Sequence, residues 1–247
     1  MIAALALVAA LSASLVSAQA AAPPEAAVAA PTDCGVTEGS FTWGFKESFR
    51  AYISGSIANG EWSTEGGINY ETPVFGSDAL AGELQLDTLS GELAVEGSMT
   101  FTGHDGILDT TISDPELRFE GNDRLVVVVD VTGTTQDFVE VSAIDIAFVT
   151  GDLSMAEWRA DGDLLVIDEV PLVLTGEGAE AFGTYPAEEP FDPITIELEA
   201  GADCAAAAVA ARSGAALPVP LIVAAALALV GSSVAGWLVV RARRRSA

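Results

Sequence analysis

The sequence predicts an all-β dominated fold: an antiparallel two-sheet, β-sandwich-like domain with one or two short helices, followed by a C-terminal transmembrane helix. Two observations predict the domain. Apolar and polar residues alternate along several short segments separated by turn-forming residues, and only one stretch has the spacing of an amphipathic helix. A third observation, a long uncharged apolar stretch near the C-terminus, predicts the transmembrane helix.

The N-terminal end of the chain has the pattern of an export signal. Residues 1–20 are apolar and close on Val16-Ser17-Ala18-Gln19-Ala20, a small-residue sequence of the kind that signal peptidase cuts. The Ala- and Pro-rich residues 21–33 follow and are typical of a linker. We therefore expect a signal peptide, a linker and then an exported domain.

The C-terminal end has the pattern of a single membrane span. The Ala-rich residues 205–216 are typical of a second linker, and residues 217–240 carry no charge. As a helix, residues 217–240 would be roughly 36 Å long, enough to cross a hydrocarbon core of about 30 Å. Arginines dominate the basic tail at 241–247, and the positive-inside rule places that tail in the cytoplasm. The expected location is the cell membrane, with one span, an extracellular domain and a cytoplasmic C-terminus.

The domain between the linkers, residues 34–204, is strongly acidic. The whole chain holds 36 Asp and Glu residues against 10 Lys and Arg residues, for a net charge of -26. Such a surface repels phosphate backbones and anionic head groups, so nucleic acid is not expected as a partner. The domain contains few basic residues: Lys46, Arg50, Arg118, Arg124 and Arg159.

Two cysteines, Cys34 and Cys204, bracket this domain. Outside the membrane they are expected to form a disulfide, and closing so long a loop would stabilise the fold by roughly 5 kcal/mol in the chain-entropy model. Metal ligation by the two cysteines is the weaker alternative, because no second pair accompanies them.

The clearest helix lies in the stretch 41–62. Residues at i, i+4, i+7 and i+8 share one apolar face: Phe45, Phe49, Tyr52 and Ile53. The opposite face carries the charged residues Lys46, Glu47 and Arg50. Gly44 is expected as the N-cap and Gly55 as the stop. So short a helix is not stable alone in water, so it needs an apolar surface to lie on.

Alternation of apolar and polar residues is clearest from Leu93 to Phe101, which predicts one half-buried strand. Similar patterns predict strands near 68–74, 83–87, 108–112, 116–120, 125–131, 138–150, 164–168, 170–175 and 194–199. Turn-forming residues separate them at 121–123, 151–152, 161–163 and 176–178. About ten strands with short connections favour two packed sheets.

The residues that could support catalysis are few, and we do not expect an enzyme. His104 is the only histidine, which excludes a histidine pair or a histidine-rich metal site. The sequence has no Gly-x-Ser-x-Gly, no P-loop and no His-Glu-x-x-His. Carboxylates are too numerous for a catalytic pair to be distinguished from a solvated acidic face. Asp161-Gly162-Asp163 has residues that could bind calcium, but a turn between strands needs no ion.

His104 lies in a Gly-rich turn, residues 102–106, between the strand that ends at Phe101 and the next strand, which begins near Ile107. A lone histidine in a loop is usually only a surface residue. This turn, however, follows a strand that faces the core, so we expect it to meet the helix face that carries Tyr52.

Three blocks of sequence occur in order along the domain. The first runs from Trp43 to Ile53 and continues from Ile57 to Trp62. The second runs from Phe101 to Asp109 with Ser113 to Pro115, and the last from Ala181 to Tyr185 with Phe191 to Ile194. Together they resemble the opening, second and closing blocks of the HtaA-type haem-binding domain of actinobacterial cell-surface haem-uptake proteins. The resemblance covers essentially the whole exported domain and implies a β-sandwich-like fold with few short helices.

The resemblance also implies a ligand and its contacts. Tyr52 would be the axial ligand of the haem iron, and His104 would hydrogen-bond the tyrosine oxygen. Tyr185 and Ser48 would make further polar contacts, to the haem propionates. The implied cofactor is ferric b-type haem, bound reversibly, and a phenolate is a hard oxygen donor suited to ferric iron. Ser48 lies four residues before Tyr52, so the two side chains can share one flank of the helix.

The resemblance implies a cell-surface haem-binding protein that captures ferric haem through its tyrosine and relays it for haem and iron uptake. Its partners would be haem, the membrane through the C-terminal helix, and other haem-uptake surface proteins or a haem transporter. The alternative is a membrane-anchored structural or adhesive β-sandwich domain that binds glycan or protein. In that case Tyr52 and the helix phenylalanines would be core residues only. A third possibility, a calcium-stabilised hydrolase, has no specific support in the sequence.

Overall fold

The computed structural model describes residues 33–135 and 137–212. The predicted signal peptide (1–20), the linker up to residue 32, the predicted span at 217–240 and the tail at 241–247 lie outside the described residues. Within the described residues, no helix has the length and apolar character needed to cross a bilayer.

The domain is mostly β, and its neighbouring strands are antiparallel. The strands are β1 (Gly35–Trp43), β2 (Glu61–Gly66), β3 (Asn69–Glu71), β4 (Val74–Gln85), β5 (Ser90–Ala94), β6 (Gly97–Gly103), β7 (Leu108–Glu120), β8 (Arg124–Thr134), β9 (Glu140–Asp152), β10 (Glu157–Asp161), β11 (Leu164–Leu174) and β12 (Pro190–Glu199). The helices are α1 (Glu47–Ser54), α2 (Gly176–Phe182) and α3 (Ala202–Arg212), with short 3-10 turns η1 (His104–Gly106) and η2 (Leu153–Met155).

The strands form one sheet that closes on itself, so the expectation of two separate sheets is wrong. Hydrogen-bonded neighbours follow the order β7, β5, β4, β1, β12, β11, β9, β8, and β8 pairs again with β7. Strands β6 and β2 extend from the other part of β7, and β3 and β10 pair with β4 and β11. Alternating apolar residues indicate one buried face per strand in either architecture, so the pattern could not distinguish a closed sheet from two stacked ones.

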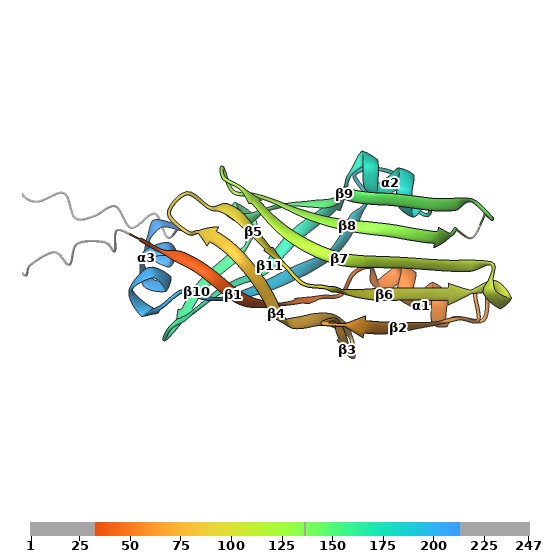
Figure 1. The fold of residues 1–247 in the computed structure, drawn as a ribbon, viewed down its shortest axis with the longest axis horizontal. Coiled ribbons are helices and arrows are strands. Elements are labelled where there is room, and N and C mark those ends of the chain that lie inside the picture. The colour runs from red at the N-terminus through yellow and green to blue at the C-terminus, as the bar shows by residue number, and fades with distance from the viewer. Residues whose placement is uncertain (1–32, 136, 213–247) are drawn as a thin grey trace, which may run out of the picture.

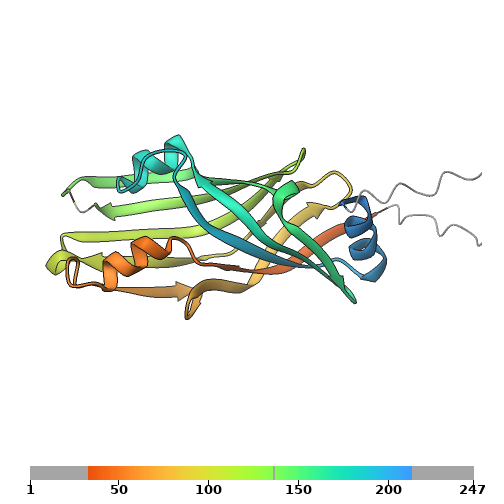
Figure 2. The same cartoon turned by 180° about the vertical axis from the view of Figure 1, so that it is seen from behind.

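The closed sheet is elongated, and its two ends carry different elements (Figure 1). Helix α3 and the start of β1 lie together at one end, whereas α1, η1 and the end of β8 lie toward the other. The view from behind shows α1 lying along one side of the molecule beside β6 and β2 (Figure 2). Helix α1 and the turn η1, which are far apart in the sequence, therefore lie toward the same end of the domain, opposite to α3.

Several strand predictions need correction. The strands predicted at 164–168 and 170–175 are both parts of β11, and β1, β2 and β10 were not predicted. The expected strand from Leu93 to Phe101 is two strands, β5 and β6, which lie one after the other along the same long strand β7. The two strands predicted at 108–112 and 116–120 are both parts of β7. Its pairing shifts between Ser113 and Glu116, around Asp114, whose φ is 53°. The alternation continues from β5 into β6 and gives no sign of that break. In β7 it changes phase between Ile112 and Leu117, and this shift is why the pattern predicts two strands there.

Helix α1 begins later than predicted. Its N-cap is Lys46, with no side-chain cap, rather than Gly44. Gly44 is needed for a close approach instead: a Cβ there would lie 2.4 Å from the Asp192 carboxylate. The end of the helix was predicted correctly, since Gly55 is the C-cap and its N–H donates to the carbonyl of Tyr52.

Residues 33–135 and 137–212 contain three α-helices rather than the predicted one or two. Residues 176–178, predicted as a turn, form the first turn of α2, where the Thr175 hydroxyl accepts a hydrogen bond from the Gly178 N–H at 2.9 Å. Residues 205–212, predicted as linker, belong to α3. Both helices lack a long apolar periodicity, because α2 is short and α3 is mostly alanine.

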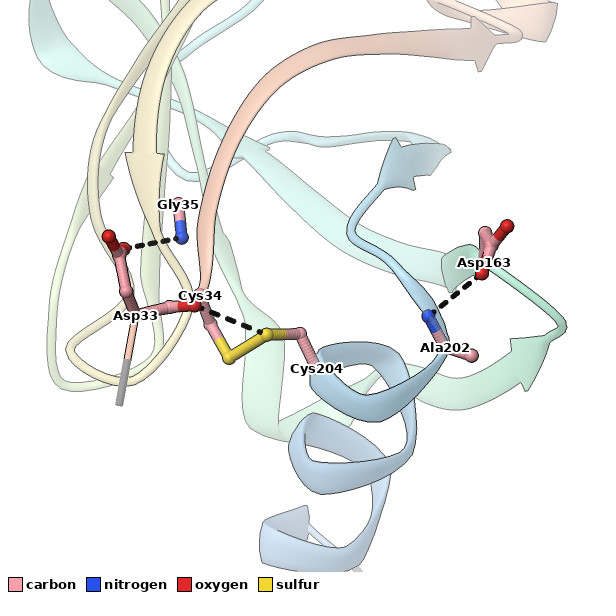
Figure 3. The surroundings of a disulfide bond; sticks show 6 residues. All are labelled: Asp33, Cys34, Gly35, Asp163, Ala202 and Cys204. Carbon is pink, nitrogen blue, oxygen red and sulfur yellow. Dashed lines mark hydrogen bonds between the residues drawn. A yellow bond between two sulfur atoms is a disulfide. The ribbon is translucent and has the colours of Figure 1, made fainter. Parts of the chain in front are cut away.

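The predicted disulfide is confirmed: Cys34 and Cys204 are bonded across a sequence separation of 170 residues. Figure 3 shows that it joins the chain just before β1 to the first turn of α3. The start of α3 is held further by the Ala202 N–H, which donates to the Asp163 carboxylate at 3.0 Å (Figure 3). Both ends of the domain are therefore fixed at one place.

Phe45 is the centre of the aromatic core. Its side chain is fully buried, and its backbone has a φ of 61°, a conformation that non-glycine residues rarely adopt. Ring centroids within 6 Å of it belong to five residues: Trp43, Phe101, Phe148, Phe182 and Phe191. Because so many rings surround it, packing holds Phe45 in this conformation directly before α1.

Replacing Phe45 is expected to destabilise the domain strongly. Phe45→Ala would leave a cavity among the surrounding rings, so the free energy of unfolding should fall by roughly 4 kcal/mol. Urea denaturation followed by tryptophan fluorescence measures this loss. Phe138→Ala is the matched control, because Phe138 has the same φ of 61° but is 71% exposed. In Phe138→Ala the free energy of unfolding should fall by no more than about 0.5 kcal/mol. Equal losses of stability in the two variants would contradict the packing argument.

Candidate functional site

Helix α1 presents Ser48 and Tyr52 on one flank. Phe49 and Ile53 are fully buried and hold the helix against the core. The Phe49 ring lies 5.1 Å from that of Phe101, measured between centroids. Ser48 and Tyr52 are four residues apart and so lie one above the other, about 5.4 Å along the helix axis. Ser48 is exposed and Tyr52 is half-buried, so both can be reached from solvent.

His104 approaches Tyr52 from the turn between β6 and β7. The backbone N–H of His104 donates to the carbonyl of Ala58 at 2.7 Å, and this bond holds the turn against the segment that follows α1. His104 and Asp105 have φ values of 52° and 56°, so the turn holds two consecutive residues in the left-handed region. In this conformation the imidazole Nε2 forms a hydrogen bond with the Tyr52 phenol oxygen. The predicted meeting of the His104 turn with the Tyr52 face is confirmed.

Tyr185 reaches the same flank of α1 from the connection between α2 and β12. Its ring stacks on Phe182, with centroids 6.1 Å apart and an interplanar angle of 15°. Its hydroxyl oxygen lies 3.1 Å from the Ser48 hydroxyl oxygen, at hydrogen-bonding distance. The structure therefore brings all four predicted residues together as two pairs, Tyr52 with His104 and Ser48 with Tyr185.

Two basic residues next to this flank are mostly buried, although the helix pattern predicts them on the exposed face. Lys46 and Arg50 were expected on the charged outer face of the helix, yet each side chain is only 12% exposed. The Lys46 ammonium lies 2.8 Å from the Glu189 carboxylate, and the Arg50 guanidinium lies 3.3 Å from that of Asp192. Their partners are 143 and 142 residues away in the sequence. No local pattern indicates such distant pairs.

Among residues 33–135 and 137–212, no group of three or more His, Cys, Asp and Glu side chains is arranged to hold a metal ion. The Asp161-Gly162-Asp163 turn joins β10 to β11, as expected for a simple connection between strands.

Comparison with known proteins identifies the family. The model of the HtaA family matches residues 38–197, more than half of the chain. The chain belongs to the HtaA family. This confirms the resemblance found in the three sequence blocks.

Two solved structures extend the comparison. The C-terminal domain of HtaA from Corynebacterium glutamicum is 28% identical, with a TM-score of 0.58, and the match covers 66% of this chain and 97% of that one. The N-terminal domain of HtaA from the same organism is also 28% identical, with a TM-score of 0.51 and the same coverage of both chains. No curated protein matches the chain.

The HtaA match contains the whole candidate site. Ser48, Tyr52, His104 and Tyr185 all fall within residues 38–197, whereas Cys34 and Cys204 lie outside that range. The disulfide thus closes the HtaA domain from outside the region that the family model covers.

Proposed function

We propose that the HtaA domain of this chain binds ferric haem, with the Tyr52 phenolate as the axial ligand of the iron. The single observation that carries this proposal is the hydrogen bond between the Tyr52 oxygen and His104 Nε2, on the flank of α1 that also carries the Ser48 and Tyr185 hydroxyls. The family membership of the chain supports it.

The donor atoms present fit haem. A phenolate oxygen is a known axial ligand of haem iron, and the bound haem supplies the iron centre that the tyrosine would hold. An imidazole nitrogen beside the phenol can accept its hydrogen bond and fix the direction of the oxygen. If the phenol proton passes to this nitrogen, the imidazolium N–H donates to the phenolate oxygen and keeps it oriented.

The second pair of residues fits the acidic edge of the ligand. Haem carries two propionate groups, and the hydroxyls of Ser48 and Tyr185 are hydrogen-bond donors suited to a carboxylate. Ser48 is exposed, so a propionate bound there would stay partly hydrated. The buried rings of Phe49 and Phe182 pack against those of Tyr52 and Tyr185 and support the two pairs from the core side.

The proposed role is haem capture at the cell surface and relay for uptake, by a binding protein rather than an enzyme. The export signal at 1–20 and the uncharged stretch at 217–240 support a single-span location with the domain outside. The four residues lie on elements at the end of the domain opposite to α3, the last element before the proposed span (Figure 1). A C-terminal anchor would therefore leave them facing away from the membrane, open to haem and to other haem-uptake proteins or a transporter.

Haemin titration of the purified protein tests the proposal. Adding ferric haem should produce a red-shifted Soret band that saturates at about one equivalent, since one axial tyrosine serves one iron. An equal amount of haemin in buffer is the reference. A Soret region that shows no saturable change would contradict the proposed function.

A further inference from the structure

We propose that Lys46 is a positioning residue of this site, whose ammonium group fixes the Tyr185 hydroxyl beside Ser48. This inference rests on the proposed function only for its effect on haem. Lys46 is not one of the four predicted residues, and its effect passes through Tyr185.

The ammonium of Lys46 makes three kinds of contact with the connection between α2 and β12 and with the first residue of β12. It lies 2.8 Å from the Glu189 carboxylate and donates to the carbonyl of Pro190 at 2.6 Å. It also lies over the ring of Tyr185, 5.1 Å from the centroid. One charge therefore holds the main chain, an acidic side chain and the aromatic ring of this connection.

The contacts of Lys46 are poorly screened by solvent. Its side chain is 12% exposed and that of Glu189 is 31% exposed. A charge-assisted hydrogen bond in such a place contributes more than the same pair on an open surface. A cation over an aromatic face is likewise more strongly bound when water is excluded.

The backbone of Lys46 ties the same residue to α1. Its carbonyl accepts hydrogen bonds from the N–H groups of Phe49 and Arg50, at 3.1 and 3.0 Å, and so starts the helix. Lys46 thus joins the start of the helix that carries Ser48 to the segment that carries Tyr185. The 3.1 Å contact between the two hydroxyls spans the same two segments.

Removal of the lysine charge should separate these segments. The sequence neighbours of the ion pair are acidic: Glu47 follows Lys46, and Glu188 precedes Glu189 in the connection. Without the ammonium, Glu189 loses the cation that binds it, because the other basic residue of this helix, Arg50, is paired with Asp192. The Tyr185 ring would keep its stacking on Phe182 but lose the contact that draws it toward α1.

The first test needs no haem. Lys46→Met keeps most of the apolar stem and removes the charge, and Lys46→Arg is the conservative rescue. Hydrogen exchange of the Glu188 amide, which donates to the Leu174 carbonyl at 2.8 Å, reports the connection. Exchange should be about tenfold faster in Lys46→Met, the factor that corresponds to loss of one charged hydrogen bond, and close to wild type in Lys46→Arg. Unchanged exchange in Lys46→Met would overturn the inference.

The second test measures haem dissociation in a double-mutant cycle. Lys46→Met should speed dissociation roughly fivefold to tenfold in the full-length protein, but less than about twofold when Tyr185→Phe is already present. Arg50→Met is the matched control, because it removes the ion pair of α1 with Asp192 and leaves the contacts of Lys46 intact. Its effect should be the same in both backgrounds.

The outcomes separate this inference from the proposed function. Faster exchange in Lys46→Met, together with no haem binding in any variant, would support the positioning role and contradict the haem proposal. Tyr52-dependent haem binding with equal effects of Lys46→Met in both backgrounds would overturn the positioning role alone. A purely structural lysine would lower stability without this dependence on Tyr185.

Discussion

Tyr52→Phe is expected to abolish coordination of the haem iron while leaving the domain folded. The change removes only the phenol oxygen and keeps the ring, which lies 6.3 Å from the Phe49 ring between centroids. Haem affinity should fall by more than about a hundredfold, since loss of groups that merely orient a ligand already costs ten- to hundredfold. Haemin titration and the ferric absorption spectrum measure the loss.

Two variants make this prediction specific. Tyr70→Phe is the matched control, because Tyr70 packs against Trp62 and Phe75, away from the four candidate residues, and the change should leave the spectrum intact. His104→Ala removes the hydrogen-bond partner of the ligand and should weaken binding by roughly tenfold to a hundredfold. If Tyr52→Phe and Tyr70→Phe bind haem alike, Tyr52 is not the ligand.

Loss of the disulfide is expected to have the largest effect on stability. Replacing both cysteines, Cys34→Ser with Cys204→Ser, frees a loop closed over a separation of 170 residues. In the chain-entropy model this lowers the free energy of unfolding by about 5 kcal/mol. Urea denaturation of the double variant against the oxidised wild type measures it.

The same experiment separates stability from binding. The disulfide joins β1 to α3, at the end opposite to α1 and η1 (Figure 1). Below its unfolding transition, the double variant should therefore bind haem with wild-type affinity. Reduction of the wild-type disulfide should reproduce the loss of stability. If the free energy of unfolding falls by less than about 1 kcal/mol, the unfolded chain without the disulfide is already compact.

The parts of the structure that could be predicted from sequence depend on local patterns. The apolar face of α1, with Phe49 and Ile53, follows from residue spacing, and so do most strands. The meeting of His104 with Tyr52 followed from a turn placed after a core-facing strand. The four candidate residues themselves came from the resemblance to the HtaA family, since nothing local distinguishes Tyr185 or Ser48 from other polar residues.

The parts that were missed depend on contacts between distant residues. The sheet closes through the pairing of β7 with β8. A closed sheet and two stacked sheets both need one apolar face on each strand, so the same alternation of residues is expected for either. The burial of Lys46 is set by Glu189, and a lysine on a short helix is ordinarily assigned to the solvent. The late start of α1 follows from the conformation of Phe45, which the surrounding rings impose.

The covalent link between Cys34 and Cys204 also determines how the domain responds to mechanical load. A tensile force applied between the segments before Cys34 and after Cys204 passes directly through the sulfur–sulfur bond. The strands between them lie outside that path, so pulling on the two ends of the chain does not shear the sheet. Force applied at these two points would therefore leave Tyr52 and His104 in their positions.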